Sequence, residues 1–409
     1  MSAWRDRLPA YAGFGAVLSA AGLPIYIYAP KYYADTYGVS LTALGAILFG
    51  LRLFDVVQDP VLGWISERLT KGKAAIISAV SLLLALSMIG LFAVPPPINP
   101  AIWFAITITG LFSAFSFLTI NFYAQGVMKA GPTGQVRLAA WRETGALLGV
   151  CIAAVAPTVL IDLSDDPFGV FAYGFAAATL AATLFMWPEW TGRSSAEPAY
   201  IRDIIADPLT RRLLILALVN ATPLAVSSTL FLFFVEARLE ATGWEGPLLV
   251  LFFLAAALSA PLWSAAAIRW GEKRVLLVAM VLAIIAFGFA ASLGAGDAGL
   301  FAVICVVSGA TIGADLTLLP AMFARRMAQV SPNGGQGFGL WSLVSKFTLA
   351  FAALLLLPLL EWSGFSAGPA PQPAGALTTL TLLYAVLPIM LKVVAIALLA
   401  STDLETTDD

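Results

Sequence analysis

Three charged side chains lie close together in an otherwise apolar stretch, LRLFDVVQDPVLGW, at residues 51–64. Arg52, Asp55 and Asp59 are spaced by three and four residues, so a helix places all three on one face, with Gly63 one turn further. If that helix spans a membrane, each central charge costs at least about 2.5 to 3.5 kcal/mol on insertion scales. We therefore expect this face to look away from lipid and to have a function.

Two carboxylates four residues apart can bind a cation or carry a proton. Asp55 and Asp59 supply hard oxygen ligands of the kind that Na⁺ prefers, and the amide of Gln58 adds another. Pro60 cannot donate to the carbonyl of Val56, so that oxygen is also available beside them. Without a cation, like-charge repulsion favours a proton shared by the pair. The alternative is a salt-bridge cluster that locks the helix to its neighbours.

The composition is that of a membrane protein with many spans. The chain has 409 residues, of which 60% are hydrophobic and 11% charged, and its mean hydropathy is +0.91. Apolar runs of about 20 residues, each long enough to cross a bilayer as a helix, recur along the whole chain. We predict an all-α membrane protein with twelve transmembrane helices, near residues 11–28, 41–64, 74–94, 101–127, 139–161, 167–187, 212–235, 247–268, 275–293, 299–324, 338–360 and 376–400.

The residues that the chain lacks limit its chemistry. It has no histidine, which excludes histidine-based catalysis and histidine metal sites. Cys151 and Cys305 both lie inside expected spans, so we expect apolar packing residues rather than a disulfide. The net charge of −2 argues against nucleic acid as a partner. With no phosphate-binding glycine loop in the sequence, we expect neither an enzyme nor a bound cofactor.

The basic residues determine the predicted orientation. Most Lys and Arg fall in the amino-terminal segment and in the loops after even-numbered spans, whereas Lys31 and Arg238 fall on the opposite side. Both termini are therefore expected in the cytoplasm, as an even number of spans requires. We expect a multi-pass protein of the cell (inner) membrane, a monomer in the lipid bilayer, with a disordered acidic tail.

The two halves of the chain match at a fixed offset of 201 residues. Where the first half has Asp55 and Asp59, the second has Ala256 and Ala260, so the carboxylates serve something that only one half does. The matching pairs are Pro60 and Pro261, Arg68 and Arg269, Lys73 and Arg274, Gly134 and Gly335, and Gln135 and Gln336. The predicted parts are two six-helix bundles at 1–187 and 212–400, a cytoplasmic linker at 188–211 and a tail at 401–409.

Charged residues also occur in later spans. Arg142 and Lys346 lie in the fifth and eleventh spans, which the repeat makes equivalent, so both could face one cavity and contact solute. The alternative is that Arg142 pairs with Glu143 or lies at the headgroup level. Asp315 could pair with Lys346 or with Lys392, and Lys392 could instead snorkel to the membrane surface.

The stretch RLFDVVQDPVLGW, residues 52–64, has the pattern R-x-x-D-x-x-x-D-P-x-x-G without a gap. This pattern, with weaker matches in FLTINFYAQ, QVRLAAWRETGALLG, DLTLLPAM and GFGLWSLVSKFTLA, resembles the glycoside-pentoside-hexuronide:cation symporter family, which includes the melibiose permease. The matches cover both halves of the chain. The resemblance implies the major facilitator fold, in which two six-helix halves rock around a solute near the middle of the membrane.

The resemblance also implies roles for particular residues. Asp55 and Asp59 occupy the positions that bind the coupling cation, Na⁺ or H⁺, while Gln58 keeps an amide and Ser116 stands where a hydroxyl is often supplied. The expected solute contacts are Ser19, Tyr26, Thr119, Tyr123, Arg142 and Lys346. The expected gating or charge network is Arg52, Asp315 and Lys392.

Ser19 and Thr119 align with positions at which the melibiose permease has carboxylates. Hydroxyls cannot offer the charge-assisted bidentate acceptance that makes carboxylates good sugar ligands, so a galactoside is not the expected solute. We expect cation-coupled symport of a small organic solute, sugar-like or glycoside-like, by alternating access. The alternative solute is an amphipathic or lysolipid-like anion, which Arg142 and Lys346 would suit. A lipid enzyme and a non-transporting sensor are the other classes, and the intact carboxylate pair speaks against the sensor.

Overall fold

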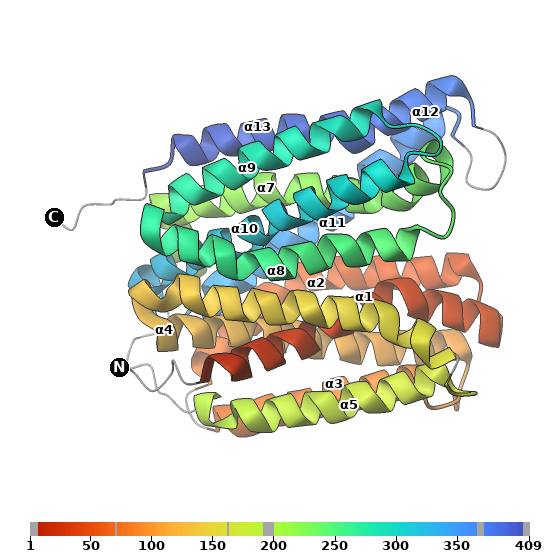
Figure 1. Cartoon of the computed structure of the whole chain (residues 1–409). Helices are drawn as coiled ribbons and strands as arrows, with labels where there is room; N and C mark the ends of the chain where they lie inside the picture. The colour runs from red at the N-terminus through yellow and green to blue at the C-terminus, as the bar shows by residue number, and fades with distance from the viewer. Residues whose placement is uncertain (1–6, 70–71, 162, 191–199, 366–371, 404–409) are drawn as a thin grey trace. The chain divides into compact units, whose positions relative to one another are not determined.

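The structure is a computed structural model that describes residues 7–69, 72–161, 163–190, 200–365 and 372–403. These residues are almost entirely helical and contain no strand (Figure 1). The predicted tail lies mostly outside the described residues, as does most of the first part of the linker. In chain order the helices are α1 (Leu8–Tyr37), α2 (Leu41–Arg68), α3 (Lys73–Phe92), α4 (Pro100–Ile161), α5 (Pro167–Met186), α6 (Ile201–Ala206), α7 (Pro208–Phe233), α8 (Glu245–Trp270), α9 (Glu272–Gly288), α10 (Ala298–Val330), α11 (Gly335–Trp362), α12 (Ala374–Thr381) and α13 (Leu387–Ala400).

Short polar residues mark where several helices begin. Ser40 accepts a hydrogen bond from the backbone of α2, and Asp166 and Asp207 do the same for α5 and α7. Each supplies an acceptor to the first helical turn, whose N–H groups have no partner within the helix. Gly38 ends α1 at a φ of 66°, a left-handed conformation that glycine adopts without strain. The sequence therefore fixes these boundaries locally.

The predicted spans correspond closely to the helices. Within the described residues, nine helices are long and apolar enough to cross a membrane, and α1, α2 and α11, which are 30, 28 and 28 residues long, complete the expected twelve. α4 contains both the fourth and the fifth expected span, as two helices that meet at a sharp kink at Gly131, where the backbone is not helical. The twelfth expected span is α12, a π-helical turn at Leu382–Val386, and α13. The all-α prediction is confirmed.

The chain divides into two compact units that do not coincide with the sequence repeat. The first unit comprises residues 1–204 together with 324–343, and the second comprises 205–323 and 344–409. The end of α10 and the start of α11 therefore group with the amino-terminal helices. The predicted division at residues 188–211 stays a prediction, and α6 lies within that linker.

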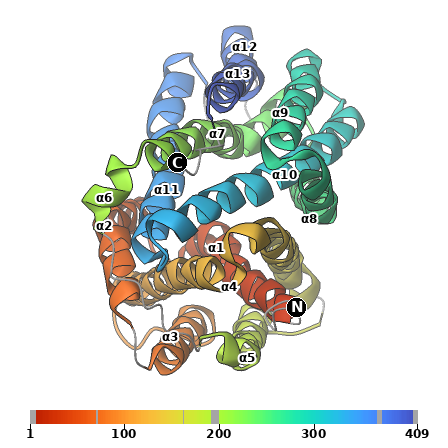
Figure 2. The same cartoon turned by 90° about the vertical axis from the view of Figure 1, so that its left-hand side faces the viewer.

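In the first unit, α1 crosses the second part of α4 at small residues. A Cβ added at Gly145 would overlap the backbone of Ala12, and one added at Gly149 would overlap that of Ala16. Small residues at a spacing of four let helix backbones approach closely inside a membrane. Elsewhere in this unit α3 and α5 lie side by side, as Figures 1 and 2 both show.

In the second unit, α8 packs closely against α10. A Cβ at Gly313 of α10 would come within 2.7 Å of the carbonyl oxygen of Ala256 on α8. Ala256 and Ala260 are fully buried in this contact region. The two alanines that replace the carboxylates of the first half thus belong to a tight helix crossing.

Candidate functional site

The charged face of α2 is buried, as its spacing predicts. Asp55 is 3% exposed and Asp59 is fully buried, whereas Leu53 and Val57 on the other side of the helix are 57% and 67% exposed. The exposed residues are apolar, which suits contact with lipid, and the buried ones carry charge. The prediction that this face looks away from lipid is confirmed.

Arg52 links the charged face of α2 to α4. Its guanidinium lies 3.2 Å from Asp55 Oδ2 and 5.2 Å from the centre of the Phe112 ring on α4. Ser116 follows Phe112 by one helical turn, so it lies on the same face of α4, and it is fully buried. The predicted hydroxyl of the cation site is therefore on the helix that Arg52 of α2 contacts.

Asp59 contacts the start of α11. Ser342 Oγ donates a hydrogen bond of 2.8 Å to Asp59 Oδ2. The two helices approach closely because α11 has Gly339 at the crossing, where a Cβ would lie 2.9 Å from the Asp59 carbonyl oxygen. Sequence reasoning missed Ser342, because no local pattern indicates which residues of the eleventh span meet the second.

Gln58, which precedes Asp59 in the sequence, has a buried amide oxygen. Its Oε1 is buried and has no hydrogen-bond partner among the described residues. A buried acceptor without a donor is costly, and a cation or a protonated group can satisfy it. The described residues contain no cluster of three or more His, Cys, Asp or Glu close enough to hold a metal. The side chains of Asp55, Asp59 and Gln58 carry oxygens, which are the hard ligands found around Na⁺.

In the second half, the positions that correspond to the carboxylates are taken up by close helix packing. Gly313, which packs against Ala256, stands 201 residues after Phe112. The first half thus has a phenylalanine and two aspartates where the second has a glycine and two alanines. Small residues let α8 and α10 close on each other, whereas the larger set in the first half encloses charge. This difference is a structural reason to assign the carboxylates a task of their own.

A second polar cluster joins the two parts of α4. The guanidinium of Arg142 lies 3.6 Å from the centre of the Tyr123 ring, and its Nε lies 2.8 Å from Glu143 Oε1. The Tyr123 hydroxyl donates to the same carboxylate at 2.8 Å, and its ring lies against Phe338 of α11. Arg142 is buried, and its Nη2 has no partner among the described residues. The pairing with Glu143 that the sequence left open is the one observed.

The other predicted solute contacts are placed less closely. Thr119 lies one turn before Tyr123 on α4, and its buried Oγ1 has no partner among the described residues. Ser19 is half-buried on α1, and the side chain of Tyr26 lies outside the described residues. Lys346 is half-buried in the second unit, so a cavity shared with residues of the first unit stays a prediction.

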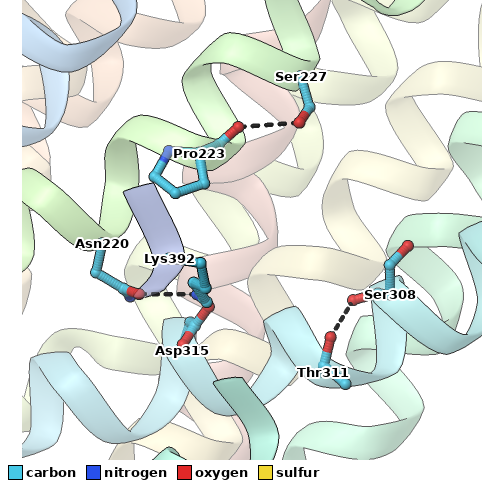
Figure 3. A network of polar contacts seen from close by, with 7 residues as sticks. All are labelled: Asn220, Pro223, Ser227, Ser308, Thr311, Asp315 and Lys392. Carbon is cyan, nitrogen blue, oxygen red and sulfur yellow. Dashed lines mark hydrogen bonds and ion pairs between the residues drawn. The ribbon is translucent and has the colours of Figure 1, made fainter. Parts of the chain in front are cut away.

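Asp315 pairs with Lys392 rather than with Lys346. The Lys392 ammonium also donates to Asn220 Oδ1 at 2.7 Å, and all three residues are buried within the second unit (Figure 3). The lysine therefore does not snorkel to the surface. Asn220, on α7, is a further partner that the sequence did not indicate.

Glu67 forms a third polar cluster at the end of α2. Its carboxylate accepts hydrogen bonds from Ser331 Oγ at 3.2 Å, from the Gln336 backbone at 2.9 Å and from Gln336 Nε2 at 3.3 Å. Gly63 lies beside these groups, where a Cβ would come within 2.8 Å of the Gly335 carbonyl oxygen. The connection between α10 and α11 is thereby fastened to α2. In the sequence, Gln336 stands out only as the repeat partner of Gln135.

The whole chain is similar to known membrane transporters. A family described as MFS/sugar transport protein matches residues 9–406, nearly the whole chain. The chain belongs to this family. MFS/sugar transport proteins include the melibiose-permease-like glycoside-pentoside-hexuronide transporters, so the resemblance found in the sequence is confirmed.

Solved structures support the same fold. A bacterial homologue of the iron transporter ferroportin in an outward-facing state is 13% identical, with a TM-score of 0.71 over 97% of this chain and 100% of that chain. The human organic anion transporter MFSD10 is 18% identical, with a TM-score of 0.62 over 95% of this chain and 99% of that one. At this identity the likeness establishes the major facilitator fold alone. This MFS/sugar transport protein is thus an integral multi-pass membrane transporter by fold and family.

Proposed function

We propose that this MFS/sugar transport protein is a symporter that couples the entry of a small polar organic solute to Na⁺ or H⁺. The observation that carries the proposal is the burial of Asp55 and Asp59 on one face of α2. Two carboxylates on one buried face supply the oxygen ligands that a monovalent cation needs, or the acceptors for a proton. A bound cation offsets part of their negative charge, which lowers the cost of holding them in a low-dielectric interior.

The cluster around Arg142 favours an uncharged solute. Glu143 already balances the charge of Arg142 at 2.8 Å, so the pair is neutral as a unit. It still offers a guanidinium N–H, while Thr119 nearby along α4 offers a hydroxyl without a partner among the described residues. Donors and acceptors without net charge match the hydroxyl groups of a glycoside or another polyol.

An amphipathic anion is the second candidate. The spare Nη2 of Arg142 is the observation that favours it, because a carboxylate or phosphate accepts strongly from a guanidinium. Competition separates the two candidates. Uptake of a glycoside that polyols inhibit and lysolipids do not would support the first, and the reverse would support the second.

Binding of radioactive Na⁺ to the purified protein tests coupling before the solute is known. Asp59→Asn should abolish saturable Na⁺ binding or, for a proton-coupled carrier, the proton release that accompanies a rise in pH, because it removes one of the two carboxylates. Asp203→Asn, the same change at an exposed position on α6, is the matched control. A variant at Asp59 that binds Na⁺ and releases protons like the parent would contradict the proposal.

The same variants should then be tested for transport in liposomes. A panel of labelled glycosides would be offered with an imposed Na⁺ gradient, a pH gradient or neither. Coupling predicts accumulation above equilibrium with one gradient only, and its loss in Asp59→Asn but not in Asp203→Asn. Solute uptake that depends on neither gradient would contradict the proposed coupling, although the protein would still be a transporter.

A further inference from the structure

The second unit contains a pocket of its own, apart from the charged face of α2. It lies between α7, α8, α9, α10 and α13, and its space, including the part open to its surroundings, is about 920 Å³. Its walls are largely apolar and aromatic, with Phe231, Phe252, Phe287, Ile304 and Tyr384 among them. Pockets with this kind of lining hold small organic molecules in other proteins.

One end of the pocket is polar. Asn220, Asp315 and Lys392 line it, with the ammonium of Lys392 held between the other two (Figure 3). Asp315 is 6% exposed, and its Oδ1 has no hydrogen-bond partner among the described residues. A buried carboxylate oxygen that lacks a donor, on a residue that lines a cavity, is a binding group for a molecule that brings one.

Three of the hydroxyl groups along the wall are acceptors as well. Ser227 donates to the Pro223 carbonyl at 2.9 Å, Ser308 to that of Ile304 at 2.6 Å and Thr311 to that of Ser308 at 2.7 Å. Their protons are therefore used within the helices, and only oxygen lone pairs remain for a ligand. Figure 3 shows Ser308 and Thr311 on α10, the helix that also carries Asp315.

Charge limits what can enter. Asp315 and Lys392 balance each other, so the pocket has no net charge that would compensate an ion for the loss of its hydration. A plain hydrocarbon would leave Asp315 Oδ1 without a donor. We propose that this pocket binds an uncharged amphiphile, with an aliphatic or aromatic body against the phenylalanines and a hydroxyl that donates to Asp315.

This site goes beyond the proposed symport, because it lies wholly in the second unit and uses none of the residues assigned to cation or solute. Its test therefore needs no ion gradient. The full-length protein is placed in nanodiscs and labelled with a diazirine derivative of 1-octanol. A diazirine alkane of the same length is the matched probe without the hydroxyl.

The expected result is saturable labelling of α7 and α10 by the alcohol probe, mapped by mass spectrometry and reduced at least about fivefold by excess 1-octanol. The alkane probe should label lipid-facing residues without saturation. Equal and equally saturable labelling of the pocket by both probes would overturn the proposal, since the pocket would then take acyl chains without regard to the head group.

Two variants and one control test where the ligand binds and whether Asp315 and Lys392 recognise its hydroxyl group. Ala283→Phe adds a ring inside the pocket and should abolish the saturable labelling, whereas Val278→Phe adds the same ring on the exposed side of α9 and should not. The double variant Asp315→Leu/Lys392→Met removes both charges together and should abolish the preference for the alcohol over the alkane. Saturable labelling that survives Ala283→Phe, or a preference that survives the double variant, would also overturn the proposal.

Discussion

At the scale of single residues, the described residues include two ion pairs with both partners buried: Arg142 with Glu143 within α4, and Asp315 of α10 with Lys392 of α13. Removing one partner of a buried pair strands the other charge, whereas removing both at once can be nearly neutral. The two pairs therefore need not add to the stability of the protein. They constrain the packing, because each charged side chain must face its partner.

We predict that Lys392→Met lowers the free energy of unfolding by about 3 to 5 kcal/mol, because Asp315 is left charged and buried. Asp315→Leu/Lys392→Met should recover most of that loss. Denaturant unfolding in detergent, followed by tryptophan fluorescence, measures both. Lys129→Met is the control, since this lysine is partly exposed and its contact with Glu189 is 4.0 Å long, which predicts a loss of about 1 kcal/mol or less. A double variant as unstable as the single one would contradict the prediction.

The sequence was sufficient for the charged face of α2 and insufficient for its partners. Spacing alone places Asp55 and Asp59 on one side of a helix, and the cost of exposing charge to lipid decides which way that side faces. It could not choose between Lys346 and Lys392 for Asp315, because that choice depends on how helices far apart in the chain pack together.

At the scale of helices, glycines set how closely α1 and α4 approach. Gly149→Ala should lower the melting temperature, because its Cβ would overlap the Ala16 backbone and force the helices apart at a cost of about 1 to 3 kcal/mol. Gly174→Ala on α5 is the matched control, since an added Cβ there meets open space. Thermal unfolding in detergent measures both. Equal melting temperatures for the two variants would show that α1 and α4 can move apart without a loss of stability.

Helix positions could be predicted from the sequence better than helix contacts. Apolar length was sufficient for the spans, including the two that meet at the kink at Gly131 in α4. The contacts of α11 with α2, through Ser342 and Gln336, could not be predicted in this way. Both are side-chain contacts between helices that lie more than 260 residues apart, where no periodicity applies.

At the scale of the whole molecule, transport by rocking halves requires that contacts between the first and second sequence halves open and close. The hydrogen bonds of Glu67 with Ser331 and Gln336 join the two halves at the end of α2. A covalent link at this point should stop the cycle in one state.

We predict that Glu67→Cys/Gln336→Cys loses at least about tenfold in uptake after treatment with a bifunctional thiol reagent, because α2 and α11 can no longer separate. Uptake by reconstituted protein is measured with and without the reagent. Each single cysteine variant, treated in the same way, is the control for modification of Cys151 and Cys305. Undiminished uptake by the linked protein would show that this contact stays closed throughout transport.

The alanines at 256 and 260 have a consequence for energetics. If the acidic pair of α2 takes up the driving ion and the matching place in the other half is packed shut, each turnover moves one elementary charge with a neutral passenger. A membrane potential of 100 mV then contributes about 2.3 kcal/mol, which supports a roughly 50-fold concentration ratio. Steeper accumulation requires a chemical gradient of the ion itself. With Ala256 and Ala260 in place of a second pair of carboxylates, the proposed carrier has one ion site and therefore a stoichiometry of one ion for each solute.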